Sequence, residues 1–198
     1  MKKLPALLLA AGVGVAAVAA SMTGAFAATP EAPVGVKTAY DINMTTIDGK
    51  PMPFSQYKGK VLLVVNTASF CGFTPQYEAL EKAQTTYRAK GFTVIGVPSG
   101  DFMGQEYKTN AEIKQFCESK FGINFPLSEK STVVGKNATP FFAWAAATLG
   151  KGEAPKWNFH KYLVDRSGKI VGSFASGTTP DSPEVTAAIQ KAIAAPAG

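Results

Sequence analysis

The chain has 198 residues, a formal net charge of +6, two cysteines and one histidine. A hydrophobic content of 46% with 17% charged residues is typical of a globular chain and argues against disorder. Two cysteines exclude a disulfide-dense scaffold and a four-cysteine zinc site, and one histidine excludes a multi-histidine metal centre.

The first 27 residues have the order of a secretory signal peptide. Lys2 and Lys3 precede an apolar, uncharged run over 4–20, and Ala25-Phe26-Ala27 places small residues where a signal peptidase cleaves. We expect cleavage after Ala27, with Ala20 as a second choice, and export to a periplasm-like compartment. An uncleaved membrane anchor is the alternative, but the run is short and rich in Gly and Ala for a membrane span.

The remaining chain divides into a flexible N-terminal arm over 28–37 and one domain over 38–198. Loss of the leader would remove two lysines and lower the net charge from +6 to +4. The other basic residues are scattered and lack the runs and interleaved aromatics typical of nucleic-acid binding. We therefore expect neither a nucleic-acid partner nor stable membrane insertion after cleavage.

The predicted elements begin with a strand over 38–44 and a hairpin turn at Asp48-Gly49. The apolar run over 61–65 predicts a strand buried on both faces. A helix starts at Thr74-Pro75, with Thr74 as its cap, and ends at Gly91. A second buried strand follows over 92–97.

Thr109-Asn-Ala-Glu112 is a capping-box pattern that opens a second helix. Its apolar face carries Ile113, Phe116, Cys117 and Phe121. A helix over 139–149, a strand pair over 159–164 and 169–174, and a helix over 183–193 complete the chain. This order predicts an α/β fold, with a central mixed β-sheet of four or five strands, helices on both faces and an N-terminal β-hairpin.

Cys71 lies on the turn between the first buried strand and the helix that follows it. Free backbone N–H groups and the positive end of the helix dipole favour a thiolate at such a position. The alternative is a buried, inert cysteine. Thr74 stands where a Cys-x-x-Cys loop would have its second cysteine, so dithiol exchange through such a loop is excluded. A single cysteine at this turn suits attack on a peroxide, which leaves a sulfenic acid.

The segment over 66–74, Asn-Thr-Ala-Ser-Phe-Cys-Gly-Phe-Thr, resembles the active-site segment of the glutathione peroxidase family. The resemblance continues at Gly104-Gln105-Glu106 and through the stretch over 156–165, which begins Lys-Trp-Asn-Phe. It spans roughly residues 38–193 and implies a thioredoxin-like fold and peroxidase activity without metal, haem or flavin. It also implies a catalytic set of Cys71, Gln105, Trp157 and Asn158, whose amide and indole N–H groups are neutral donors for a thiolate and a departing oxygen.

Cys117 matches the resolving cysteine of two-cysteine, thioredoxin-using members of that family. Its periodicity alone also fits a core residue. If it resolves, the helix around it must unwind locally, because a disulfide needs Cα atoms within about 7 Å. The resemblance implies a peroxide substrate and a thiol reductant, either a thioredoxin-like protein or glutathione. The long insertion of tetrameric members is lacking, which favours a monomer.

Two residues depart from the family pattern. Asp101 places a carboxylate in the loop after the second buried strand, and it would disfavour the Cys71 thiolate if it pointed inward. His160 follows Trp157-Asn158-Phe159, and we expect an ordinary hydrogen bond for it rather than a Cys–His catalytic pair. Two other functions remain open: a thiol redox sensor or relay, and a non-catalytic thioredoxin-like binding domain with a static disulfide.

Overall fold

A four-stranded mixed sheet forms the centre of the computed structural model, which describes Met1 and residues 33–196. The signal peptide predicted over 1–27, apart from Met1, and residues 28–32 of the predicted arm lie outside the described residues. The strands are β3 (Val61–Thr67), β4 (Phe92–Pro98), β5 (Lys161–Val164) and β6 (Ile170–Phe174). Their order is β4-β3-β5-β6, with β3 and β4 parallel and the other pairs antiparallel. The predicted parallel pair and antiparallel closing pair are confirmed.

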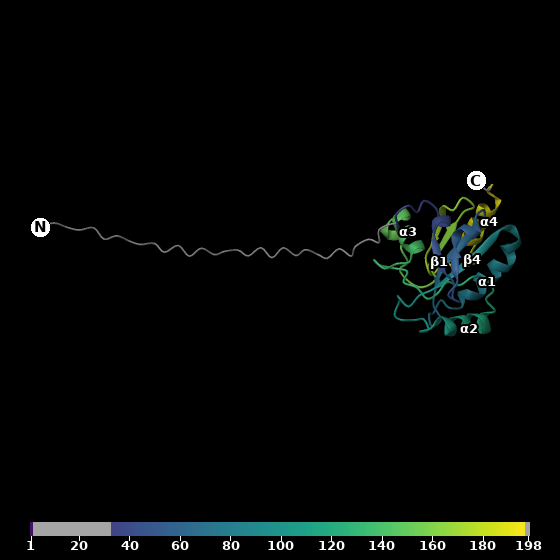
Figure 1. Ribbon diagram of the computed structural model, residues 1–198, viewed down its shortest axis with the longest axis horizontal. Coiled ribbons are helices and arrows are strands. Elements are labelled where there is room, and N and C mark those ends of the chain that lie inside the picture. The colour runs from purple at the N-terminus through teal and green to yellow at the C-terminus, as the bar shows by residue number, and fades with distance from the viewer. Residues whose placement is uncertain (2–32, 197–198) are drawn as a thin grey trace.

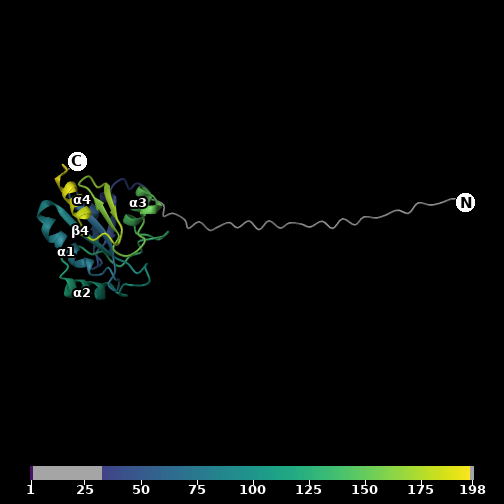
Figure 2. The ribbon, with the colours of Figure 1, turned by 180° about the vertical axis from the view of Figure 1, so that it is seen from behind.

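The residues that the structure describes also form four α-helices: α1 (Gln76–Tyr87), α2 (Asn110–Phe121), α3 (Pro140–Leu149) and α4 (Pro183–Ala194). Both ribbon views place α3 on one side of the sheet and α1 with α4 on the other (Figure 1 and Figure 2). In the same views α2 lies at the opposite end of the fold from the C-terminus. The predicted α/β class with helices on both faces is therefore confirmed. No helix among residues 33–196 is both long enough and apolar enough to cross a membrane.

The two sides of the sheet bury separate apolar clusters. Val61, Leu63 and Val65 pack with residues of α1 and α4, whereas Leu62 and Val64 pack with residues of α3. All seven residues of β3 are buried, as the continuous apolar run predicted. Burial of each aliphatic side chain over 61–65 stabilises the fold by about 2 kcal/mol, so the central strand is a rigid support for the loop that follows it.

The N-terminal hairpin is confirmed as a separate two-stranded sheet of β1 (Asn43–Thr45) and β2 (Pro51–Pro53). The strand predicted over 38–44 is wrong in its first half, where Ala39–Asp41 forms a 3₁₀ helix. The reason is local, because the Asp41 carboxylate accepts hydrogen bonds from the backbone N–H groups of Lys37 and Thr38 at 3.0 and 2.9 Å. Such an acidic cap favours a helical turn over an extended strand.

Two further boundaries differ from the sequence prediction. Thr74 does not cap α1; its hydroxyl instead donates to the carbonyl of Ala68 at 2.8 Å and accepts from the backbone N–H of Cys71 at 3.0 Å. The strand predicted to start at Phe159 starts at Lys161, because Phe159 adopts a left-handed backbone with φ of +64°. Both differences concern residues next to the candidate site.

Candidate active site

Cys71 sits in the irregular turn between β3 and α1. Its side chain is buried, with 7% of the residue exposed, and it is a free thiol. The backbone N–H of Phe73 points at its sulfur, with an N–Sγ distance of 3.4 Å. The Thr74 hydroxyl ties the Cys71 backbone to Ala68 and so fixes the turn. An N–H group aimed at sulfur stabilises negative charge there, which is the condition for a nucleophilic thiolate.

Gln105 and Asn158 come together from loops that are far apart in the sequence. The Asn158 side-chain amide donates to Gln105 Oε1 at 3.0 Å, which leaves the Gln105 amide N–H groups free to face another acceptor. The Gln105 backbone carbonyl accepts from the backbone N–H of Phe70 at 3.0 Å. Because Phe70 precedes Cys71, this bond attaches the Gln105–Asn158 pair to the cysteine loop.

Trp157 is half-buried beside this pair. It packs against the apolar cluster that contains Cys71, and its ring lies 5.7 Å from that of Phe102 between centroids. Its backbone carbonyl accepts from the side-chain amide of Asn66 at 3.1 Å. The structure thus joins Gln105 directly to Asn158 and holds Trp157 next to them through the chain.

Two exposed apolar side chains come from the segments that carry Cys71 and Gln105, one directly before Cys71 and one two residues before Gln105. Phe70 is 55% exposed and Met103 is 81% exposed, although most large apolar residues of the fold are buried. The Phe70 ring lies 4.4 Å from the Tyr107 ring between centroids. These side chains give the surroundings of Cys71 an apolar surface that the sequence analysis did not identify.

Cys117 lies within α2 in a different environment. It is fully buried and is also a free thiol. Burial raises the pKa of the Cys117 thiol to about 11, the Tyr77 hydroxyl partly opposes that shift, and the negative charge of Glu106 adds to it. In this conformation Cys117 is therefore held as a neutral thiol. This environment fits both interpretations of Cys117, a core residue and a resolving cysteine that acts only after α2 opens.

Residues of β3, α1 and two loops form a small cluster of buried polar side chains. Its members are side-chain oxygens that make no hydrogen bond of good geometry in the structure: Thr67 Oγ1, Ser69 Oγ, Tyr77 Oη and Glu106 Oε2. They are close to one another nonetheless, since Tyr77 neighbours Thr67 and Cys117, and Glu106 neighbours Ser69. Burial raises the pKa of Glu106, whose other carboxylate oxygen accepts from the backbone N–H of Tyr107 at 2.8 Å. Such oxygens in native proteins are normally satisfied by internal water. Sequence reasoning missed this cluster because Glu106 is distant in the chain from Thr67, Ser69 and Tyr77 and joins them only in the folded protein.

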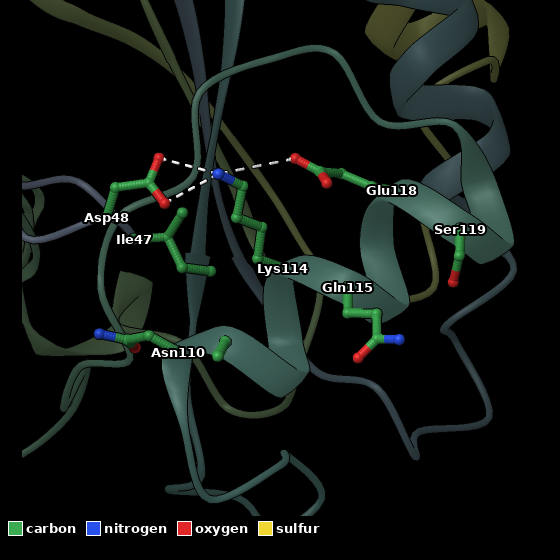
Figure 3. A pocket seen from close by; sticks show the side chains of 8 residues that line it. Ile47, Asp48, Asn110, Lys114, Gln115, Glu118 and Ser119 are labelled. Carbon is green, nitrogen blue, oxygen red and sulfur yellow. Dashed lines mark hydrogen bonds and ion pairs between the residues drawn. The ribbon is translucent and has the colours of Figure 1, made fainter.

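Helix α2 is restrained at both ends. Thr109 and Glu112 form the predicted capping box, and Gly122 ends the helix with a left-handed backbone at φ of +61°. On its outer face Lys114 reaches across a surface depression to Asp48 in the hairpin turn, at 2.8 Å, and lies 3.9 Å from Glu118 (Figure 3). These restraints stabilise the helix that carries Cys117.

The structure settles the position of both residues that depart from the family pattern. Asp101 does not point toward the site; its exposed carboxylate accepts from the backbone N–H groups of Val133 and Val134 at 2.6 and 3.1 Å. His160 makes the ordinary hydrogen bond that we expected, between Nε2 and Ser173 Oγ at 3.1 Å. Burial lowers the pKa of His160 to about 4, so its ring is neutral at physiological pH.

No three His, Cys, Asp or Glu side chains come close enough together within the described part of the chain to hold a metal ion. The Cys71 sulfur receives a backbone N–H, the paired amides of Gln105 and Asn158 are attached to its loop through the Phe70 backbone, and the Trp157 indole belongs to the residue before Asn158. This donor set suits a sulfur anion and a peroxide oxygen.

A comparison with known families connects this geometry to one of them. The glutathione peroxidase family model matches residues 39–146, a segment that includes Cys71, Gln105 and Cys117. The chain belongs to the glutathione peroxidase family.

The chain aligns with curated glutathione peroxidase relatives over most of their length. The chain is 44% identical over 164 residues to the hydroperoxy fatty acid reductase gpx1 of Synechocystis sp., covering 79% of this chain and 96% of the relative. It is 45% identical over 138 residues to the glutathione peroxidase-like peroxiredoxin HYR1 of Saccharomyces cerevisiae, covering 68% of this chain and 84% of the relative.

Solved structures support the same fold. The T. cruzi GPX1 crystal structure matches with a TM-score of 0.62 and 33% identity, covering 79% of this chain and 95% of that one. A thiol:disulfide interchange protein DsbE from Chlorobium tepidum matches with a TM-score of 0.57 but only 21% identity, covering 79% of this chain and 95% of that one. The second likeness concerns the fold alone and confirms that it is thioredoxin-like.

Proposed function

We propose that the protein is a thiol-dependent peroxidase that reduces hydrogen peroxide and organic hydroperoxides. The observation that carries this proposal is the junction of three groups at one loop. The Cys71 sulfur receives a backbone N–H, and the hydrogen-bonded pair of Gln105 and Asn158 is attached to the preceding residue. Family membership and the peroxidase names of the relatives support the same reaction.

In the first step the Cys71 thiolate attacks one peroxide oxygen. A sulfur–oxygen bond forms and the oxygen–oxygen bond breaks, and the second oxygen leaves as water or an alcohol after it takes a proton. Cys71 becomes a sulfenic acid. Gln105, Asn158 and Trp157 are the neutral donors that hold the thiolate and the departing oxygen, and preorganised donors of this kind lower the barrier by a few kcal/mol each at most.

In the second step Cys117 attacks the sulfenic acid. A sulfur–sulfur bond forms, the sulfur–oxygen bond breaks, and water leaves with the proton that Cys117 gives up. An external thiol then reduces the disulfide. Because Cys117 is fully buried within α2, this step requires α2 to open, and opening also returns the thiol to water, where its pKa approaches the ordinary value.

The exposed apolar side chains of Phe70 and Met103 indicate the substrate class, and the thiol chemistry indicates the reductant class. Exposed Phe70 and Met103 beside the cysteine loop suit an organic hydroperoxide with an apolar chain, and one relative is named for hydroperoxy fatty acids. A thioredoxin-like protein or glutathione would return the electrons. The physiological reductant of an exported protein depends on its compartment, since periplasm-like spaces do not keep thiols reduced as the cytosol does.

The cellular setting is part of the proposal. The charged, apolar and small-residue order of residues 1–27 supports export with cleavage after Ala27, and a peroxidase there would respond to oxidative stress. We propose that the exported protein acts as a monomer. N-terminal sequencing of the protein recovered from the periplasmic fraction tests the cleavage, and sedimentation of the mature protein tests the monomer.

Peroxide turnover with a generic dithiol reductant tests the activity. We expect steady consumption of hydrogen peroxide and of a fatty acid hydroperoxide by the wild type. A redox relay would instead oxidise a client protein while turning over poorly with a generic reductant. A binding domain would consume no peroxide at all, and that result would overturn the proposal.

A further inference from the structure

Two buried polar residues that the proposed chemistry does not use lie beneath the segment that carries Trp157 and Asn158. They are Asn66 on β3 and Lys161 on β5, and both are fully buried. Buried amides and amines are costly unless they make hydrogen bonds, so the bonds that they make indicate why they are there.

Asn66 fixes both ends of the Trp157–His160 segment. Its side-chain amide donates to the carbonyl of Trp157 at 3.1 Å, and its side-chain oxygen accepts from the backbone N–H of His160 at 2.9 Å. Its backbone carbonyl accepts from the N–H of Phe159 at 2.6 Å. Its backbone N–H donates to the carbonyl of His160 at 3.3 Å, so one residue on the rigid central strand satisfies four backbone groups of this segment.

Lys161 holds the same segment from the other side. Its Nζ donates to the carbonyl of Phe159 at 2.5 Å and to the carbonyl of Ala175 at 3.3 Å. No carboxylate among the described residues forms an ion pair with it. The strand neighbours opposite it are Val65 and Phe174, so this lysine is buried for its hydrogen bonds and not for a salt bridge.

Phe159 is the residue on which these contacts converge. Its φ of +64° is rare for a bulky side chain and costs about 1–3 kcal/mol, so the surroundings must hold it. Its N–H is bound by Asn66 and its carbonyl by Lys161. This backbone conformation sets the direction of Asn158, whose side chain reaches Gln105 at 3.0 Å.

We propose that Asn66 and Lys161 are positioning residues for peroxide reduction. They hold the left-handed Phe159 backbone, and through it they place Asn158 on Gln105 and Trp157 beside the cysteine loop. Neither residue touches the reacting atoms in this proposal. The inference rests on the proposed peroxidase function and adds two residues to the four that the sequence analysis selected.

The test substitutes Lys161→Met, which keeps the length and apolar stem but removes the donors. We expect the rate constant of Cys71 oxidation by one equivalent of peroxide to fall roughly tenfold to a hundredfold, since small misplacements of catalytic groups have effects of that size. Leu163→Ala is the matched control, because Leu163 is buried on the same strand and makes no side-chain hydrogen bond to the segment. It should lower the urea midpoint and leave the rate constant within about twofold.

A second readout separates positioning from general stability. In an Asn158→Ala background Lys161→Met should slow the reaction much less than it does in the wild type, while its effect on the urea midpoint stays the same. Asn66→Asp provides an independent variant, because it keeps an acceptor for His160 and loses the donor to Trp157. The Asn66→Asp variant remains informative if Lys161→Met does not fold. We expect it to slow Cys71 oxidation strongly in the wild type and much less in the Asn158→Ala background.

The pH profile gives a third readout. Burial lowers the pKa of Lys161 to about 7, and the adjacent titratable group, His160, is neutral above pH 4 to 5. The ammonium donates stronger hydrogen bonds than the amine, so reactivity per thiolate should decline as pH rises through 7 in the wild type and stay flat in Lys161→Met. Wild-type rates in both variants would overturn the inference, whereas an unreactive wild-type Cys71 would overturn the peroxidase function itself.

Discussion

The two cysteines of this protein are both buried free thiols, yet the fold holds them in opposite ways. Cys71 lies in an irregular turn where a backbone N–H points at its sulfur, and the residue before it is hydrogen-bonded to Gln105, the partner of Asn158. Cys117 lies inside a capped helix with its thiol pKa raised to about 11. The same functional group therefore receives a hydrogen-bond donor at one position and is kept neutral at the other.

This difference teaches how one fold can order two thiol reactions. A nucleophile that reacts first needs donors already in place, because they cost no reorganisation at the moment of reaction. A thiol that reacts second should stay neutral and buried until it is needed. In that state it reacts neither with the peroxide nor with other disulfides. The local backbone, a turn in one case and a helix in the other, makes the distinction.

The largest expected effect comes from removing the first thiol. Cys71→Ser should abolish peroxide consumption above the buffer rate, because serine does not form a comparable nucleophile. Cys117→Ser should consume one equivalent of peroxide and then stop, since attack survives and resolution does not. Peroxide disappearance measured against protein concentration gives both stoichiometries. Equal, sustained turnover by either variant contradicts the division of roles.

The next effect concerns the amide pair. Gln105→Ala and Asn158→Ala should each slow Cys71 oxidation roughly a hundredfold, as expected for loss of one preorganised donor. The double variant should be little slower than either single one, because the two side chains act through their 3.0 Å hydrogen bond. Gln115→Ala on the exposed face of α2 is the control and should react at the wild-type rate. Additive losses would show that the two amides act separately.

A pH dependence of stability reports on Cys117. Its folded-state pKa of about 11 lies above the ordinary value of 9.0, so folding favours the protonated thiol. The resulting stabilisation is complete below pH 9 and is lost as pH rises from 9 toward 11, by about 2 kcal/mol. Urea unfolding at pH 8 and pH 10.8 should show this loss in the wild type and in Cys71→Ala. It should be smaller in Cys117→Ala, and an unchanged loss there contradicts the buried-thiol account.

The smallest effects concern the restraints on α2. Thr109→Ala removes the capping box and should weaken the first turn by about 1 kcal/mol, which speeds Cys117 alkylation a few-fold. Asp48→Asn removes the exposed ion pair with Lys114, and surface pairs contribute little, so its effect should be smaller still. Mass spectrometry after timed alkylation measures both. Slower alkylation of Cys117 in Thr109→Ala would contradict a resolving step gated by helix opening.

The sequence predicted the parts of the fold that depend on local pattern. The buried run over 61–65, the capping box at Thr109 and the hairpin turn at Asp48-Gly49 each specify an element within a few residues, and all three are confirmed. The direction of the Asp101 carboxylate depended on the loop over 133–134, which no local pattern reveals.

The support beneath the site was also beyond local pattern. Asn66 and Lys161 acquire their roles only when β3 and β5 pair and the Phe159 backbone turns left-handed. One signal was present in the sequence, since a lysine that begins an otherwise apolar strand requires a hydrogen-bonding reason to be buried. Its partners are backbone carbonyls, which leave no trace in the sequence.

Mapping of the sulfur atoms after one equivalent of peroxide tests the central claim most directly. Reduced wild-type protein should yield a Cys71–Cys117 disulfide by mass spectrometry, and Cys117→Ser should yield a trappable sulfenic acid at Cys71 alone. Oxidation that appears first at Cys117, or a Cys71 that stays reduced after prolonged exposure, would contradict the assignment of attack to the turn and resolution to the helix.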